Sequence, residues 1–400
     1  MKTIKEIFRI GYGPSSSHTM APRFAAERFL KKNPAATSFE VTLYGSLAAT
    51  GKGHLTDKAI LDVLSPHGVV SIVWEPTVFL PFHPNGMRFK AFIDDALVDE
   101  WMVYSVGGGA LAEEGVPSSL PDIYEMSKMT DIMNWCDRSG KTYWEYVIGC
   151  ENDWTLVQYL KEVWETMKES VERGLRTEGR LPGPLNLPRK AAAYNIKANG
   201  FQHTLRSRGL VFSYALAVSE ENASGGRIVT APTCGSCGVL PAVLYHIWKS
   251  YEFDEIRIIR ALATAGLIGN IVKSNASISG AEVGCQGEVG VACAMAAGAA
   301  SQLFGGSVAQ IEYASEMALE HHLGMTCDPV CGLVQIPCIE RNAFAAARAL
   351  DANIYSAFTD GRHRVSFDKV VVTMNKTGRD IPSLYKETSE GGLAIDYKQM

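Results

Sequence analysis

Two different hydrophobic periods divide this 400-residue chain near residue 128. Up to that point, apolar and polar residues alternate over short runs, as in strands with one buried face. Beyond it, apolar residues recur every three to four positions over long runs, as in helices with one buried face. A strand repeats every second residue and a helix about every 3.6, so one segment cannot satisfy both patterns. We therefore predict an α+β protein, with a small mixed α/β domain over residues 1–128 and a larger all-helical domain over residues 129–400.

The expected elements follow these periods. A helix over residues 20–32 begins after serines that can cap its free amides. Strands are expected at residues 39–44, 69–74, 88–93 and 97–106. Helices of the second domain are expected at residues 154–171, 190–199, 241–249, 255–271, 287–303, 309–319 and 339–350. Residues 289–304 are uncharged and rich in Ala and Gly, but this run is shorter than the ~20 residues of a membrane span. A closely packed internal helix is therefore favoured over a membrane span.

The overall charge excludes two classes of partner. Lysine and arginine number 38 and aspartate and glutamate 43, which gives a net charge of −5. This balance provides no attraction to nucleic acid or to an anionic membrane, so neither partner is expected. Residues 1–6 lack the apolar segment of a signal peptide, and we expect a cytoplasmic protein. In such a reducing compartment, the nine cysteines of a chain this long favour metal binding or catalysis over disulfides.

Most of these cysteines have simple interpretations. Cys234 and Cys237 form a C-x-x-C motif, which can be a redox pair or half of a zinc site. No second such pair, and no histidine pair at zinc-finger spacing, accompanies it. Small buried residues near a helix start are therefore the favoured interpretation. Cys136, Cys150 and Cys293 stand alone in helical patterns, where cysteine usually serves as a small buried apolar residue.

Three other cysteines lie in glycine- and proline-containing segments at helix junctions. These are Cys285, Cys327 and Cys338. Thiols in loops can converge without strain, and a helix N-terminus lowers the pKa of a thiol and favours the metal-binding thiolate. Three thiolates on a 4Fe–4S cluster would leave one iron without a protein ligand, free to act as a Lewis acid. Their spacing matches no common ferredoxin motif, so from the residues alone a cluster is one possibility among several.

Several long motifs carry a resemblance to a known family. The motifs are Gly13-Pro14-Ser15-Ser16-Ser17-His18-Thr19, Thr50-Gly51-Lys52-Gly53-His54, Thr56-Asp57-Lys58-Ala59, His83-Pro84-Asn85-Gly86-Met87-Arg88-Phe89, Tyr104-Ser105-Val106-Gly107-Gly108-Gly109, Thr230-Ala231-Pro232-Thr233, the segment 277–290 around Cys285, and Cys327-Asp328-Pro329-Val330. Together they make the chain resemble the iron–sulfur L-serine dehydratases (L-serine ammonia-lyases), bacterial enzymes that use no pyridoxal phosphate. The resemblance extends from about residue 4 to residue 394.

This resemblance implies a β-type domain fused to an α-type helical domain, and a 4Fe–4S cluster on Cys285, Cys327 and Cys338. It implies the elimination of water from L-serine to give pyruvate and ammonia, in serine catabolism that feeds pyruvate and gluconeogenesis. The cluster iron would act as a Lewis acid on the substrate hydroxyl. We also expect a homodimer. Some members end in a cysteine that binds the fourth iron, whereas this sequence ends Lys398-Gln399-Met400, so we expect an iron that is open to substrate and oxygen.

The reaction also needs a base for the α-proton and contacts for the substrate carboxylate. Imidazole, with a pKa of about 6.5, suits the base role at neutral pH. His54 lies in a glycine-flanked loop and is preferred over His18. The candidates for substrate binding are Ser15, Ser16, Ser17 and Thr19 at a helix start, Asn85 in a tight loop, and the cations Lys273 and Arg341. The structural alternatives are helix capping for the residues at the helix start, a simple turn for Asn85, and solvated helix charges for the two cations. An active site built from both domains is expected, since ligands favour such interfaces.

Three other functions stay open at this point. A related cluster enzyme could act on threonine or on a hydroxy acid such as tartrate, and only substrate profiling separates it from a serine enzyme. A cluster-bearing binding or regulatory protein would need no base, which the polar residues of the first domain disfavour. A pyridoxal-phosphate dehydratase would need a lysine in a recognisable motif, and none is found. An absorption spectrum separates a cluster from that cofactor.

Overall fold

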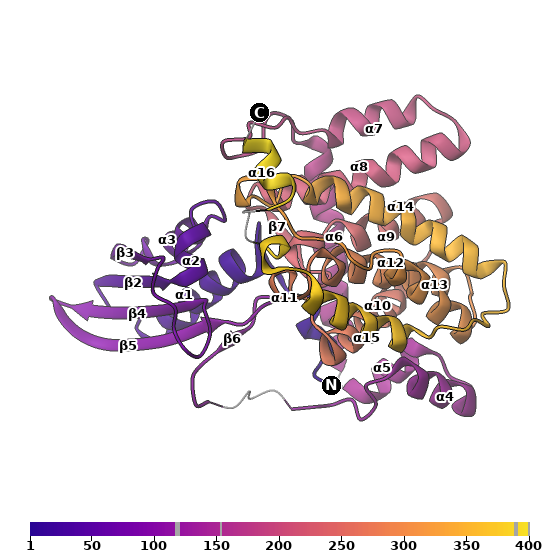
Figure 1. The fold of residues 1–400 in the computed structure, drawn as a ribbon, viewed down its shortest axis with the longest axis horizontal. Coiled ribbons are helices and arrows are strands. Elements are labelled where there is room, and N and C mark those ends of the chain that lie inside the picture. Colours follow the sequence, from indigo (N-terminus) through magenta and orange to yellow (C-terminus); the bar gives the residue numbers. More distant parts are fainter. Residues whose placement is uncertain (117–120, 153, 388–390, 399–400) are drawn as a thin grey trace. The chain divides into compact units, whose positions relative to one another are not determined.

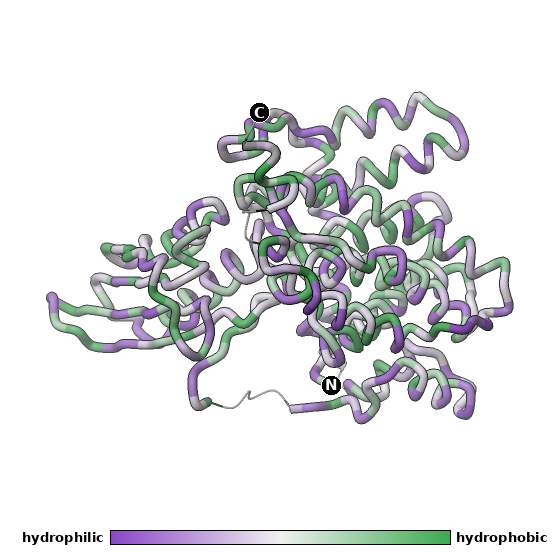
Figure 2. The backbone as a smooth tube through the Cα atoms, viewed as in Figure 1, coloured by the Kyte–Doolittle hydropathy of each residue, from purple (hydrophilic) through white to green (hydrophobic). Residues whose placement is uncertain are grey.

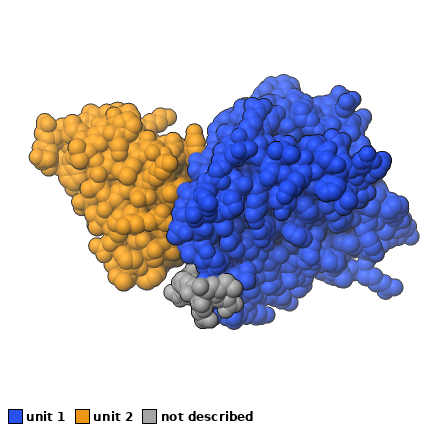
Figure 3. Space-filling view, turned by 90° about the horizontal axis from the view of Figure 1, so that it is seen from above, with its two compact units in different colours: residues 1–11, 121–400 blue, residues 12–120 orange. Residues whose placement is uncertain are grey.

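The computed structural model describes residues 1–116, 121–152, 154–387 and 391–398. They form two compact units, shown in different colours in Figure 3. We call residues 12–120 the sheet unit, and residues 1–11 together with 121–400 the helical unit. The α+β prediction is confirmed, because a mixed sheet in the first unit is followed by helices in the second (Figure 1). The change of period indicates a boundary at residue 128, and the structure assigns the chain to the helical unit from Pro121 onward.

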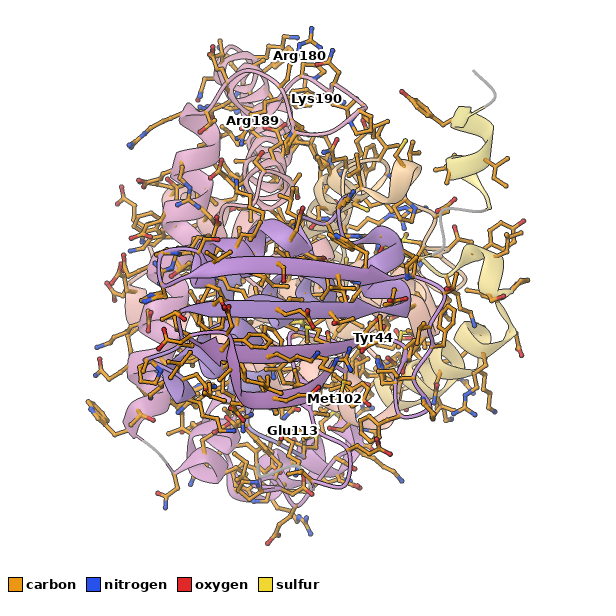
Figure 4. All side chains as sticks on the ribbon, turned by 90° about the vertical axis from the view of Figure 1, so that its left-hand side faces the viewer. Tyr44, Met102, Glu113, Arg180, Arg189 and Lys190 are labelled. Carbon is orange, nitrogen blue, oxygen red and sulfur yellow. The ribbon has the colours of Figure 1, made fainter. Side chains whose placement is uncertain are left out.

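The sheet unit has one five-stranded sheet in the order β3-β2-β4-β5-β6. Its strands are β2 (Ser38–Tyr44), β3 (Val69–Glu75), β4 (Gly86–Ile93), β5 (Ala96–Ser105) and β6 (Leu111–Ala112). Strand β2 pairs in parallel with β3 and antiparallel with β4, and β4 and β5 form a hairpin. Figure 4 labels Tyr44, the last residue of β2, and Met102 on β5. The strands that the alternation predicted are confirmed.

Helices α1 (Ala21–Lys32), α2 (Gly45–Thr50) and α3 (Thr56–Leu64) complete this unit. Its apolar core joins Phe29 of α1 and Ile60 of α3 to Phe39 and Phe89 of the sheet. Along β4, buried and less buried residues alternate, and the hydropathy alternates with them (Figure 2). This core holds the short segments that carry the histidines, because α2 and α3 flank the loop of His54.

The helical unit is built from thirteen α-helices over the residues that the structure describes. They are α4 (Met129–Ser139), α5 (Tyr143–Glu151), α6 (Trp154–Arg176), α7 (Ala191–Asn199), α8 (His203–Ala223), α9 (Val239–Tyr251), α10 (Glu255–Asn275), α11 (Gly280–Val283), α12 (Val289–Leu303), α13 (Val308–Glu320), α14 (Cys338–Ala357), α15 (Phe367–Asp380) and α16 (Leu393–Lys398). Every helix that the sequence period predicted is present. Helices α4, α5, α8, α11, α15 and α16 are additional.

Helix α12 runs through the middle of this unit and packs against α9, α10, α13 and α14 (Figure 1). All of its residues except Gln302 are buried. Its small side chains allow close approach: a Cβ atom on Gly298 would lie 2.4 Å from Ile268 Cδ1 and 2.5 Å from Ser315 Oγ. The expected internal helix is therefore confirmed. Among the described residues, no helix is long and apolar enough to cross a membrane.

The first residues of the chain pack into the helical unit. The N-terminal amine donates a hydrogen bond to Tyr124 O at 2.8 Å, and Ile4 and Phe8 approach Gly266 of α10. Strand β1 (Ile10–Tyr12) pairs with β7 (Arg227–Val229). Further along, the loop between α6 and α7 brings Arg180 near Arg189 (Figure 4). Arg189 forms a buried ion pair with Glu221 of α8 at 2.8 Å, which anchors this loop.

Candidate active site

The first candidate cluster lies in the sheet unit, where the chain enters α1. Residues Ser16–Met20 form one turn of π-helix, which Ser15 caps by accepting a hydrogen bond from His18 N at 3.1 Å. A serine with extended backbone is a favoured cap because its hydroxyl satisfies an otherwise unpaired amide. Ser15 therefore caps this turn, which is the structural alternative to substrate binding. The wide turn directs His18 into the interior, where its side chain is buried.

The imidazole of His18 is held at both nitrogens. Its Nδ1 shares a hydrogen bond with Ser17 Oγ at 2.8 Å, and its Nε2 shares one with Ser46 Oγ at 3.0 Å. Burial lowers the pKa of His18 well below its usual value, and the charge of His54 lowers it further. His18 is therefore neutral at physiological pH. A hydroxyl at each nitrogen makes it a fixed hydrogen-bonding group.

His54 lies beside it, with its ring centre 4.7 Å from that of His18. Its Nδ1 lies 3.1 Å from Thr50 O, and because a carbonyl oxygen only accepts, Nδ1 carries the proton. The lone pair of the neutral ring is therefore on Nε2, for which the described residues provide no hydrogen-bond partner. Burial lowers the pKa of His54, which is 3% exposed. His54 thus has the properties of a base ready to accept a proton at Nε2.

Two threonine hydroxyls hold the histidine backbones together. Thr19 Oγ1 donates to His54 O at 2.6 Å and accepts from Ser15 N at 3.1 Å. Thr56 Oγ1 donates to His18 O. The turn between α2 and α3 is also tight, because a Cβ atom on Gly51 would lie 2.2 Å from Leu47 O. Thr19 was expected to contact the substrate, and its hydroxyl is engaged in positioning His54.

Asn85 borders the same cluster through Ser105. Asn85 O accepts from Ser105 N at 3.0 Å, and Ser105 Oγ donates to Ser17 O at 2.8 Å. Within the described part of the chain, Asn85 Oδ1 is buried and has no hydrogen-bond partner. An unpaired buried acceptor is unfavourable, and a donor on a bound ligand would satisfy it. This orphaned oxygen is compatible with the expected binding role of Asn85.

The second candidate cluster lies in the helical unit and contains three free thiols. Cys285 stands just before α12, Cys338 begins α14, and Cys327 lies in the loop before α14. Cys285 is 3% exposed and Cys327 is 5% exposed, whereas Cys338 is partly accessible. We call these three residues the thiol cluster. The charge of Cys285 raises the pKa of both Cys327 and Cys338, and from this we infer that the three thiols lie near one another.

The protonation of the thiol cluster differs from expectation. Burial raises the pKa of Cys285 to about 11, and the charge of Glu288 adds to the rise. Burial also raises the pKa of Cys327 and Cys338. The expected lowering at helix N-termini is therefore wrong, since loss of solvent outweighs the helix dipole. A bound metal would replace these protons, because a cation stabilises the thiolate far more strongly than a helix end does.

Two charged side chains accompany the thiols. Glu288 Oε1 accepts from Thr233 Oγ1 at 2.7 Å, and its Oε2 lies 3.9 Å from Cys327 Sγ. Arg341 lies beside Cys285, whose pKa it lowers, and donates to Thr326 O at 2.7 Å. Arg341, expected to hold the substrate carboxylate, therefore lies in the thiol cluster.

Glycines keep space open beside these groups. A Cβ atom on Gly280 would lie 2.6 Å from Glu288 Oε2 and 3.1 Å from Cys327 Sγ. A Cβ atom on Gly235 would lie 3.2 Å from Glu288 Oε1. A side chain at either position would press against Glu288 or Cys327, so the two glycines leave room beside these groups.

The thiol cluster fits an iron–sulfur cluster better than a single metal ion. Among the described residues, no three His, Cys, Asp or Glu side chains converge closely enough to hold one ion. Thiolates of a 4Fe–4S cluster each bind a different iron, so their sulfurs surround the cluster rather than one point. Three neighbouring, unbridged thiols with an arginine beside them match that requirement.

The remaining expected residues lie elsewhere or in simpler settings. Lys273 Nζ lies 3.7 Å from Glu6 Oε2, and burial together with Arg9 lowers its pKa. Within the described residues, no contact of Lys273 with the thiol cluster is found. Within the described residues no disulfide joins the remaining cysteines, of which Cys136, Cys234, Cys237 and Cys293 are buried, Cys150 is half-buried and Cys331 is exposed.

The structure also adds residues that sequence reasoning missed. Ser46 binds His18 Nε2, and Ser105 donates to Ser17 O. Glu387 lies beside Cys327, with Glu387 N donating to Cys327 O at 2.7 Å. Ser105 stands within one of the long motifs, which is a signal that could have found it. Ser46 and Glu387 lie outside every motif used above, and only long-range pairing identifies them.

Comparison with known proteins matches both parts of the chain to one family. The family model for the serine dehydratase beta chain matches residues 3–69 and 64–116, and that for the alpha chain matches residues 113–394. L-serine dehydratase TdcG of Escherichia coli is 42% identical, over 98% of both chains. L-serine dehydratase of Streptomyces coelicolor is 40% identical over 98% of both chains. L-serine dehydratase of Helicobacter pylori is 37% identical over 99% of both chains.

Proposed function

Because the chain belongs to the L-serine dehydratase family, we propose that it eliminates water from L-serine and releases pyruvate and ammonia, using the two clusters described above. The convergence of three free thiols beside Arg341 is the observation that carries this proposal. Elimination needs removal of the α-proton and departure of the β-hydroxyl, and each of the two clusters suits one of these tasks. The aminoacrylate product then converts to pyruvate and ammonia in water.

We assign removal of the α-proton to His54 Nε2. The bond from Thr50 O keeps the proton on Nδ1, so Nε2 is available in the neutral ring. When Nε2 takes the α-proton, the imidazolium retains its Nδ1 donor to Thr50 O, which stabilises the new charge. Thr19 keeps the residue in position through His54 O. His18 serves as the neutral neighbour, bound by Ser17 and Ser46.

Departure of the hydroxyl is the task of the helical unit. A 4Fe–4S cluster held by Cys285, Cys327 and Cys338 would supply a Lewis-acidic iron for the substrate hydroxyl. Arg341 would offset part of the negative charge of these thiolates, since its guanidinium lies beside Cys285 and Cys338. The glycine backbone at Gly280 leaves room beside Cys327.

Substrate binding draws on the remaining expected residues. We propose that Ser15, Ser16, Ser17 and Asn85 contact the carboxylate and neighbouring polar atoms of serine, and that Thr19 and Arg341 act mainly by positioning. The orphaned Asn85 Oδ1 supports the role of Asn85, because this oxygen only accepts and would pair with the ammonium or hydroxyl group of serine. Lys273 remains a candidate for the carboxylate despite its contact with Glu6.

The biological setting is part of the same proposal. We propose a cytoplasmic homodimer that acts in serine catabolism and feeds pyruvate and gluconeogenesis, with residues 1–128 as the β-type domain and 129–400 as the α-type domain. None of the nine cysteines, all of them among the described residues, forms a disulfide, which suits a reducing compartment. Light scattering of the purified protein tests the dimer, and limited proteolysis tests the domain boundary.

The decisive experiment is anaerobic reconstitution with iron and sulfide, followed by measurement of pyruvate formed from L-serine. We expect broad absorption near 400 nm, together with pyruvate. Threonine, tartrate and glycerate are measured in parallel, since these compounds separate the related cluster enzymes. A fully loaded protein that forms no pyruvate from L-serine would overturn the proposed function.

A further inference from the structure

One short helix contacts both imidazole rings of the sheet unit. Helix α2 carries Ser46 as its second residue and ends at Thr50. Ser46 Oγ shares a hydrogen bond with His18 Nε2 at 3.0 Å, and Thr50 O lies 3.1 Å from His54 Nδ1. Thr50 Oγ1 also donates to Ser46 O at 2.9 Å, which links the two ends of the helix. A single element of six residues therefore holds one nitrogen of each ring.

Helix α2 is itself fixed at its first residue. Gly45 has a φ of +52°, a left-handed conformation that favours glycine. A Cβ atom on Gly45 would lie 2.5 Å from Pro84 O, so the start of the helix lies directly against the loop that carries Asn85. Because the backbone of α2 is confined in this way, a change in the Ser46 side chain acts on His18 rather than on the helix.

The two rings differ in the atoms that they leave available. Both nitrogens of His18 have hydroxyl partners, which are Ser17 and Ser46. His54 is held at Nδ1, and across the described ranges no hydrogen bond joins the two rings. The ring centres are nevertheless only 4.7 Å apart, at an interplanar angle of 34°. At this separation, a turn of the His18 ring would bring one of its nitrogens to the lone pair of His54 Nε2.

Such a turn becomes favourable when the hydroxyl of Ser46 is lost. A neutral imidazole has one N–H donor and one acceptor nitrogen. His18 is buried, so without Ser46 its Nε2 would lack a partner, and an unsatisfied buried polar group is costly. A hydrogen bond from His18 Nε2 to His54 Nε2 would satisfy both nitrogens. It would also occupy the lone pair with which His54 accepts a proton.

We propose that Ser46 is a positioning residue for the elimination: by holding His18 Nε2, it prevents a hydrogen bond between the two rings and keeps His54 Nε2 free to take the α-proton. The inference rests on the proposed function, in which His54 is the base. Ser46 acts through His18 and needs no contact with the substrate. Its loss should therefore slow removal of the proton and leave substrate affinity unchanged.

The test compares variants of Ser46 in anaerobically reconstituted protein with equal iron content. Ser46→Ala removes the hydroxyl, whereas Ser46→Thr keeps it. Ser46→Val has the shape of the threonine variant and lacks the hydroxyl. Ser65→Ala is the matched control, since Ser65 is exposed at the C-cap of α3. For each protein, kcat and KM are measured for pyruvate formation from L-serine.

Ser46→Ala and Ser46→Val should lower kcat about 3- to 10-fold at an unchanged KM, because one hydrogen bond must break before His54 can act. Ser46→Thr should recover most of this loss, and Ser65→Ala should match the wild type. His18→Asn has no Nε2, so in that background Ser46→Ala should cause no further loss. An equal loss in both backgrounds, an unchanged kcat in Ser46→Ala, or a rise in KM alone would each contradict the inference.

A second measurement needs no turnover. With isotopically labelled histidine, nitrogen NMR separates protonated from unprotonated ring nitrogens, and the signal of His54 Nε2 should shift in Ser46→Ala as it accepts a hydrogen bond. A loaded wild type that forms no pyruvate defeats the proposed function, whereas the NMR comparison still tests Ser46. An identical His54 Nε2 signal in both proteins counts against the inference. If neither Ser46→Ala nor Ser46→Val folds, Ser46 is a structural residue and the inference is wrong.

Discussion

Replacing His54 with asparagine tests the assignment of the base most directly. The side-chain amide of Asn can take the place of Nδ1 and donate to Thr50 O, while the Nε2 lone pair is lost. The hydrogen bond at 3.1 Å and the backbone contact from Thr19 are therefore kept. A positioned general base contributes about 10²- to 10⁴-fold to a rate. We expect His54→Asn to lower kcat by that range and to leave stability and iron content close to those of the wild type.

The assay is anaerobic pyruvate formation from L-serine with equal iron content in each protein. His67→Asn is the control, because His67 is exposed in the turn after α3. Burial lowers the pKa of His54, so its neutral form persists below pH 6.5, and wild-type kcat should stay level from pH 7.5 to pH 6.5 and fall only at lower pH. This acidic limb should be absent in His54→Asn. A fully loaded His54→Asn with at least a third of the wild-type kcat would refute the reasoning.

Three further predictions concern the cluster and the core. Alanine at Cys285, Cys327 or Cys338 should each abolish absorption near 400 nm after reconstitution, whereas Cys136→Ala should retain it; retention in any of the first three contradicts the ligand set. Gly298→Ala should lower the free energy of unfolding by about 1–3 kcal/mol in urea, because its Cβ would overlap Ile268, whereas Gly149→Ala, with open space around it, should not be destabilised. Burial raises the pKa of Glu316 to about 8, so the stability that it contributes is full below pH 4.5 and is lost as pH rises through 8. The stability of Glu316→Gln relative to the wild type should therefore increase between pH 5 and pH 8, and a constant difference in urea unfolding would contradict this.

The helices that the sequence predicted and those that it missed differ in their surroundings. Helix α6 has one buried and one exposed face, so its apolar residues recur at the helical period. Helix α8 is buried on nearly all sides from Val211 to Ala223, and no polar face remains to mark the period. Its Glu220 and Glu221 are buried as well, each held by a partner from the loop before α7. A charged pair inside the protein looks like a surface feature until its partners are known.

The histidines illustrate a second limit. Their motifs singled out His18 and His54, and the pKa of imidazole made either one a plausible base. The choice between them depends on which ring nitrogen is free. Ser46 binds Nε2 of His18, whereas the described residues leave Nε2 of His54 without a partner. Ser46 stands 28 positions from His18, so no local sequence pattern predicts this hydrogen bond.

The sequence by itself determined the fold class, most of the helices and strands, and the identity of the family. These follow from local periodicity and from long motifs, both of which are complete within short stretches of chain. Only the tertiary structure decided which groups meet: three thiols with Glu288, Arg341 and Glu387 in the helical unit, and His18 with His54, Ser46 and Ser105 in the sheet unit. The physical reason is that such meetings depend on the packing of helices and strands far apart in sequence. Burial in that packing also sets the protonation of the groups that it brings together.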